Sequence, residues 1–134
     1  MEHEVTFISD DIRHELGQKI SLLGLYDRAI VFKSLPARLL KICVYQRWTD
    51  AVSISSAMIE FRGAPVGAGT YRVIGKSSEP EPHGPHGARI LLAFGPIDFV
   101  KEGKLEVVTY FNEESAARHV HEIEIRVDPN LKIV

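Results

Sequence analysis

The chain of 134 residues has only one cysteine, Cys43. A single thiol excludes an internal disulfide, and it excludes a zinc site built from several thiolates. We therefore expect a reducing compartment, the cytoplasm. The opening residues Met1-Glu2-His3-Glu4 are acidic where a signal peptide needs basic residues. No apolar run approaches the ~20 residues that span a bilayer, so we predict a soluble protein with no membrane partner.

The chain also lacks an excess of charge of either sign. Its 16 basic and 18 acidic side chains are interspersed and give a formal net charge of −2 at pH 7. Nucleic acids and anionic lipids select for a basic face, so we expect neither as a partner. Hydrophobic residues at 45% and charged residues at 25% are ordinary globular usage. The length suits a single domain over residues 1–134 with one core.

Sustained helical spacing is the third feature that the sequence lacks. No segment repeats apolar residues at i, i+3 and i+4 over more than about three turns. Alternation with a period of two is common instead, and it is clearest in residues 39–48. There Leu40, Ile42 and Val44 share the face that we expect in the core. The opposite, mixed face carries Lys41, Cys43, Tyr45 and Arg47.

Similar alternation runs through residues 53–62, 103–111 and 118–127. Residues 5–13 and 19–26 flank a turn that contains a glycine, which predicts an opening hairpin. Turn signals recur every ~8–12 residues, the spacing of sandwich proteins. We therefore predict an all-β fold. Its expected form is a two-layer antiparallel β-sandwich of seven to nine strands, in an immunoglobulin-like or C2-like arrangement.

One segment has no strand character. Residues 76–87 hold three prolines, two glycines and no aliphatic side chain. Such a composition is typical of an exposed connection with few apolar contacts to hold it. We predict a long, mobile loop here.

The first third of the chain resembles a known family. The similarity lies in Ser9-Asp10-Asp11-Ile12-Arg13, in Gly17 with residues 19–26, and in the corner Leu35-Pro36-Ala37. These features, over residues 5–37, resemble an uncharacterised bacterial family that carries a domain of unknown function. Its members share an opening hairpin that ends in a Ser-Leu-Leu-Gly type of strand, followed by a Phe-Pro-Ala or Leu-Pro-Ala corner. The resemblance implies a small β-sandwich and supplies no activity, so it assigns no functional residues.

Histidines are the first candidates for chemistry. His119 and His121 are two apart on an expected strand, so both point to one face and two imidazoles could reach one metal ion. The alternative is a pair of partly buried histidines at the rim of the sheet. A zinc site normally uses three or four protein ligands, so a third ligand would decide between the two. His83 and His86 lie in the proline-rich segment, where a mobile backbone would position them poorly.

Other catalytic signatures are missing from the sequence. The chain has no G-x-S-x-G elbow, and Cys43 lies in the middle of an expected strand rather than at a helix N-terminus. Residues 67–69 read Gly-Ala-Gly without the Lys-Ser/Thr and helix that a phosphate loop requires. We expect no cofactor, and the sequence does not favour an enzyme.

Tyr45, Arg47 and Trp48 are the candidate binding residues, because their types are enriched in binding hot spots. The alternative is ordinary sheet packing with a solvated arginine. We favour a non-enzymatic interaction module or a small accessory subunit of a soluble assembly. Its partner would be another protein or a second copy, and a homodimer is the expected state. The competing hypothesis is a metal-dependent enzyme or metal-binding domain that uses His119 and His121.

Overall fold

The computed structural model describes residues 2–17, 19–49, 54–67, 71–73, 81–83 and 87–132, with no side-chain description for 71–73 and 81–83. In this part of the chain the regular structure is all-β, as predicted, apart from one 3-10 turn at Ala64–Val66. No helix in these residues is long and apolar enough to cross a membrane. The strands are β1 (Glu2–His14), β2 (Ile20–Tyr26), β3 (Ala29–Phe32), β4 (Ala37–Leu39), β5 (Ile42–Thr49), β6 (Ala57–Arg62), β7 (Tyr71–Val73), β8 (Glu81–His83), β9 (Gly87–Phe94), β10 (Ile97–Phe99), β11 (Gly103–Phe111) and β12 (His119–Val127).

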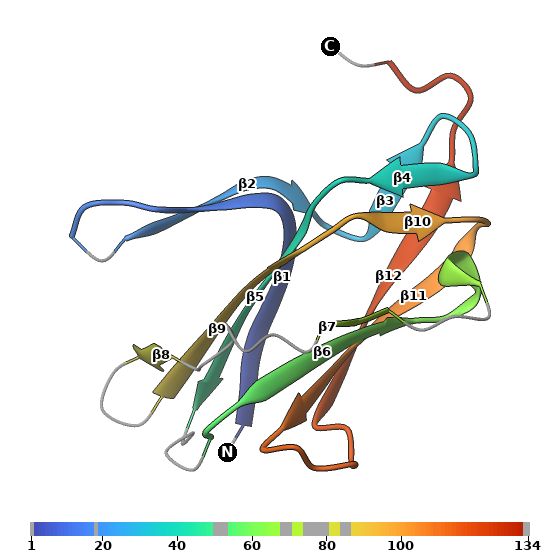
Figure 1. Ribbon diagram of the computed structural model, residues 1–134. Helices are drawn as coiled ribbons and strands as arrows, with labels where there is room; N and C mark the ends of the chain where they lie inside the picture. The colour runs from blue at the N-terminus through green and yellow to red at the C-terminus, as the bar shows by residue number, and fades with distance from the viewer. Residues whose placement is uncertain are drawn as a thin grey trace.

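The strands form two five-stranded sheets and one small sheet (Figure 1). The first sheet has the order β2-β1-β5-β9-β8, and all its pairs are antiparallel. The second sheet has the order β3-β12-β11-β6-β7. Its edge pair β3–β12 is parallel, unlike the antiparallel pairs that we expected throughout. Strands β10 and β4 pair with each other beside the two larger sheets.

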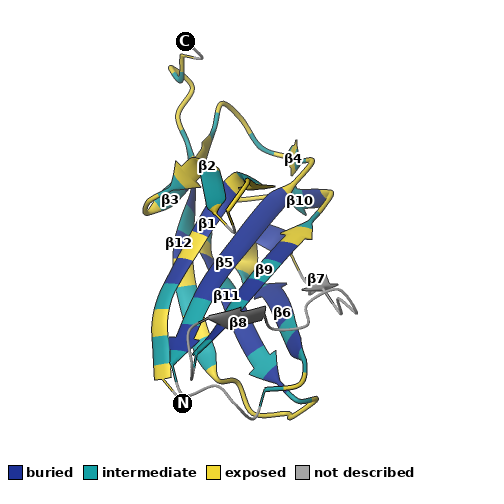
Figure 2. Ribbon diagram, turned by 90° about the vertical axis from the view of Figure 1, so that its left-hand side faces the viewer, coloured by how far each residue is buried: buried dark blue, intermediate teal, exposed yellow. Residues whose placement is uncertain are grey.

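A buried core lies between the two larger sheets. Strand alternation places one side of each strand on the inner face, and Figure 2 shows β5 buried along most of its length. Both sheets contribute to one apolar cluster, so the sheets share a core. Its buried members are Ile8, Ile30, Ile42, Val44, Ile59, Phe61, Val66, Leu92, Ile97, Phe99, Leu105, Val107, Ile123 and Ile125.

Two sequence expectations need correction. The described residues hold twelve strands rather than seven to nine. The surplus consists of three-residue strands such as β4, β8 and β10, which are too short to show a periodic pattern. Leu40 does not continue the buried face of β5, because the strand begins at Ile42 and the Leu40 side chain is 78% exposed.

The segment expected to be a long loop, residues 76–87, contains β8, which pairs with β9 at the edge of the first sheet. Gly87 begins β9. Residues 76–80 and 84–86 lie outside the described residues, so the expected mobility there stays a prediction.

The predicted opening hairpin is confirmed, and it projects from the body of the molecule. Strand β1 pairs with β5 only as far as Ser9, whereas its pairing with β2 continues to His14. Residues 10–26, which we call the arm, therefore extend beyond the sheet and bend away from it (Figure 1). Gly24 lies opposite Asp10, where a Cβ atom would lie 2.3 Å from Asp10 Oδ2. The missing side chain leaves room for that carboxylate, which accepts a hydrogen bond from the Tyr26 hydroxyl.

Candidate functional site

The structure brings a third histidine to the predicted pair. His119 and His121 lie on the same face of β12, where they alternate with the exposed residues Val120 and Glu122. His3 reaches them from β1 of the first sheet. Its ring stacks on the His119 ring with the centroids 3.6 Å apart and an interplanar angle of 11°. We call His3, His119 and His121 the histidine cluster.

Trp48 packs against the histidine cluster on its buried side. Its side chain is only 3% exposed, and its ring meets the stacked pair edge-on. The ring centroid lies 5.2 Å from that of His3 and 6.2 Å from that of His119. Phe111 of the second sheet packs against the same indole at 4.7 Å. The aromatic contacts therefore join the first sheet to the second.

A buried polar chain runs beside these rings. Trp48 Nε1 donates a hydrogen bond to Gln46 Oε1 at 3.1 Å, and Gln46 Nε2 donates to Thr109 Oγ1 at 2.8 Å. Gln46 and Thr109 have no exposed surface, so these bonds satisfy groups that water cannot reach. Because Gln46 belongs to β5 and Thr109 to β11, the chain is a second link between the sheets.

The surroundings of the histidine cluster favour the neutral rings. Burial lowers the pKa of His3, and the nearby His119 and His121 lower it further. Burial also lowers the pKa of His119 and of His121, the latter with a further contribution from His119. His3 Nε2 lies 2.6 Å from Thr6 Oγ1, a partner without charge. The three rings are therefore expected to be uncharged at pH 7.

This geometry does not converge on a metal ion. The lone pairs of an imidazole lie in the plane of its ring, so two rings stacked in parallel direct theirs side by side rather than at one point. Within the described ranges, no group of three His, Cys, Asp or Glu residues is arranged to hold a metal. His83 has no described side chain and His86 lies outside the described residues.

The predicted binding residues do not share one surface. Tyr45 and Arg47 lie on the outer face of the first sheet, whereas Trp48 points to the inner face. Tyr45 is itself largely covered, because Phe7 stacks on it with the ring centroids 6.1 Å apart. Arg47 is partly exposed, and its Nη2 atom lies 3.2 Å from Glu4 Oε1. The accessible aromatic ring here is Phe7, which is 36% exposed and which no pattern in the sequence marks as a binding residue.

The arm and the outer face of the first sheet meet in a recess. It has a volume of about 150 Å³ and is lined by Ile12, His14, Lys41, Cys43, Leu91, Leu92 and Ala93. Burial raises the pKa of the Cys43 thiol, which keeps the sulfur protonated and a poor nucleophile at pH 7. An ion pair between Asp11 and Lys41, the residue before β5, joins the arm to the first sheet. The recess is thus a corner of mixed polarity, lined by His14 and Lys41 as well as aliphatic side chains, and its one thiol is not activated.

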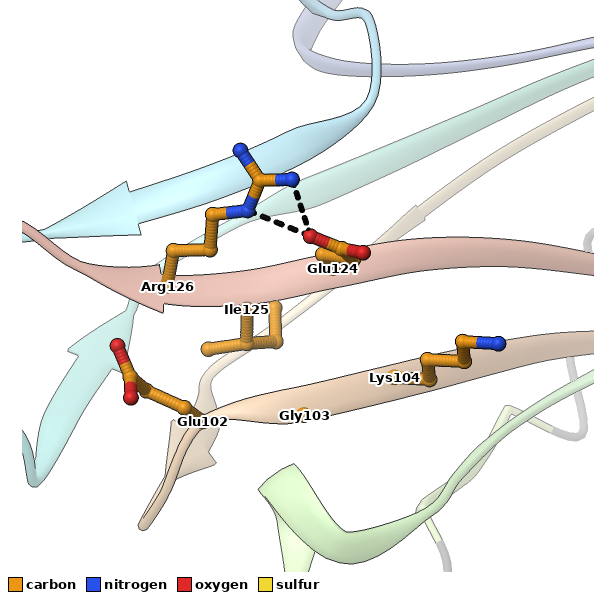
Figure 3. A pocket seen from close by; sticks show the side chains of 6 residues that line it. All are labelled: Glu102, Gly103, Lys104, Glu124, Ile125 and Arg126. Atoms are coloured by element: carbon orange, nitrogen blue, oxygen red, sulfur yellow. Dashed lines mark hydrogen bonds and ion pairs between the residues drawn. The ribbon is translucent and has the colours of Figure 1, made fainter.

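A second depression, of about 240 Å³, lies on β11 and β12 (Figure 3). Its lining residues are Glu102, Gly103, Lys104, Glu124, Ile125 and Arg126. Arg126 Nε donates to Glu124 Oε2 at 2.5 Å, and Glu102 Oε1 accepts a bond from the Val127 amide. The charges are largely compensated by these contacts, so the depression does not select a charged ligand.

Comparison with known proteins does not add a relative. No protein-family model, curated protein or solved structure shows a significant match to this chain.

Proposed function

We propose that this protein is a non-enzymatic interaction module, and that its partner is a second copy of the same chain. The observation that carries the proposal is a set of exposed apolar side chains on the arm and on the outer face of the first sheet. We call this set the apolar surface. Its members are Phe7, Leu16, Leu23 and Leu25.

The register places Phe7, Leu23 and Leu25 on one side of the first sheet. Leu25 pairs with Ser9, and Ser9 pairs with Cys43, so the three residues form one row across the first sheet. Phe7 and Tyr45 form the adjacent row on the same face. Ser9, Cys43 and Tyr45 are buried, so the exposed apolar area on this side comes from Phe7 and from the arm, where Leu16 at the tip is 95% exposed.

The arm needs support that its own pairing does not supply. Strand β2 is the edge of the first sheet, with β1 as its one neighbour there. A two-stranded hairpin is marginally stable at best in water, and its stability rises when an apolar face packs against another element. A partner that covers Leu23 and Leu25 would provide that packing.

Charge pairing favours a second copy over an oppositely charged protein. In a two-fold dimer the same patch meets itself, so a patch of one sign would repel its copy. Here Arg47 pairs with Glu4, and Asp11 pairs with Lys41 and Arg13, which leaves mixed signs. The net charge of −2 also does little to keep copies apart.

Light scattering tests the proposal. We expect the wild type at twice the monomer mass of 15.0 kDa, and a double variant Leu23→Lys/Leu25→Lys at the monomer mass. Val100→Lys, at a 50% exposed position outside the apolar surface, is the matched control and should stay dimeric. A 15.0 kDa wild type across the micromolar range would refute the proposal. If the double variant remains a dimer, the arm is not part of the interface.

We infer that the two larger sheets form a sandwich of immunoglobulin-like or C2-like arrangement, and their shared core supports this. The resemblance over residues 5–37 supports membership of the bacterial family of unknown function. A cytoplasmic location is supported by the single thiol, which is buried as Cys43.

A metal-binding domain or metal-dependent enzyme is the second candidate. One observation favours it, namely that His3 lies beside His119 and His121. Three histidines would match the protein ligands of an open zinc site. The parallel stacking of two of the rings weighs against it, so we rank it below the interaction module.

A further inference from the structure

The histidine cluster joins two strands that are not neighbours in any sheet. His3 is the second residue of β1 in the first sheet, and His119 is the first residue of β12 in the second. Both strand ends lie at the end of the molecule where the N-terminus is marked, away from the arm (Figure 1). The stack of the two rings is therefore a contact between sheets at the open end of the core.

Each described strand that packs against the two stacked rings presents either an uncharged side chain or another histidine to them. Strand β1 offers the Thr6 hydroxyl, β5 offers Trp48, and β11 offers Thr109, whose hydroxyl accepts a bond from Gln46. Strand β12 adds His121. The nearby charged residues are engaged elsewhere or exposed. Glu4 pairs with Arg47, Arg118 pairs with Glu114, and the Glu2 side chain is exposed.

We propose that the stacked His3 and His119 rings, packed on Trp48, form an acid-sensitive clasp that opens the contact between the two sheets when the rings are protonated. Two imidazolium rings at a centroid distance of 3.6 Å repel each other, and no described carboxylate bonds to either of them. Opening would separate the start of β1 from β12 and give water access to the indole. This inference goes beyond the proposed dimer and does not depend on it.

The direction of the pH dependence follows from the burial of the rings. The folded state lowers the pKa of all three histidines below the ordinary value of about 6.5, so the unfolded or opened chain binds protons more readily. The contribution of the clasp is complete above about pH 6.5. It declines as the pH falls from there through the lowered pKa values, and the open form gains population.

Trp48 reports the opening directly because it is the only tryptophan. We expect its emission to shift to longer wavelength as the pH falls from 7.5 to 5, while the β-sheet circular dichroism signal persists. His3→Phe/His119→Phe keeps two stacked rings without titratable nitrogens and should lose the shift. The control His14→Gln changes an exposed histidine of the arm and should keep it. An unchanged wild-type emission, or the same shift in the double phenylalanine variant, would overturn the clasp.

A second measurement covers the case in which the phenylalanine variant does not fold. Proton NMR of the wild type follows the imidazole resonances of each histidine through the same pH range. We expect His3 and His119 to titrate below the ordinary histidine pKa of about 6.5. Titration of His3 and His119 at or above the ordinary histidine pKa of about 6.5 would contradict the clasp. Repeating the emission titration on Leu23→Lys/Leu25→Lys separates the opening of the clasp from dimer formation. The emission shift should persist in this monomeric variant.

Discussion

Removing the Gln46 side chain tests whether the buried polar chain stabilises the contact between the sheets. Gln46 has no exposed surface, and its amide serves two partners, Trp48 Nε1 and Thr109 Oγ1. Gln46→Leu preserves the approximate volume and leaves both partners buried without a hydrogen bond. The substitution therefore isolates the polar contribution from that of packing.

The magnitude follows from the two groups that lose their partner. A buried unsatisfied polar group costs about 1–3 kcal/mol, so two such groups cost roughly 4 kcal/mol. The added apolar surface of leucine returns about 1–2 kcal/mol. We expect Gln46→Leu to lower the free energy of unfolding by about 2–3 kcal/mol. The second substitution Thr109→Val removes one orphaned hydroxyl, so the double variant should be more stable than Gln46→Leu alone by about 1–2 kcal/mol.

Urea unfolding of the wild type, both single variants and the double variant measures this coupling. With Trp48 fluorescence as the signal, a loss of 2–3 kcal/mol lowers the urea midpoint by roughly 1 M or more. Thr49→Val is the control, since the Thr49 hydroxyl makes only a 3.4 Å bond to the Glu2 carbonyl at the surface. Its effect should stay within about 0.5 kcal/mol.

Additive effects of the two substitutions would refute the reasoning. If the Gln46–Thr109 bond links the sheets, the second change must recover stability that the first has lost. A double variant that is less stable than either single variant would show that the two side chains contribute independently.

Two further predictions concern backbone packing and metal content. Gly95→Ala should destabilise the protein by roughly 3 kcal/mol in the same urea assay, because a Cβ atom there would lie 1.9 Å from the Leu40 carbonyl oxygen. Gly17→Ala, in open space with φ +78°, should cost only about 1 kcal/mol, and equal losses would contradict the packing argument. Elemental analysis of purified protein should find well under one equivalent of transition metal. Near-stoichiometric zinc, nickel or iron that is lost in His119→Ala/His121→Ala would move the metal hypothesis to first place.

The sequence by itself determined that the protein is built from strands. It indicated the buried faces only in part, because Cys43 and Tyr45 of the expected mixed face of β5 are buried as well. In the alternating segment 103–111, Leu105, Val107, Thr109 and Phe111 share one face of β11, and all four are fully buried. Alternation reports such faces because successive side chains of a strand point to opposite sides, a property of the local backbone alone. The opening hairpin was predictable for the same reason, since its two strands and its turn are contiguous in the chain.

The tertiary structure alone decided which faces meet. His3 is separated from His119 by most of the chain, and no local pattern marks it as the partner of a histidine in the other sheet. Trp48 adjoins Arg47 in sequence but lies on the opposite face, where it packs with Phe111. The projection of the arm likewise depends on β1 leaving β5 after Ser9. Pairing between distant strands depends on the complementarity of whole faces, and periodicity within one strand does not encode it.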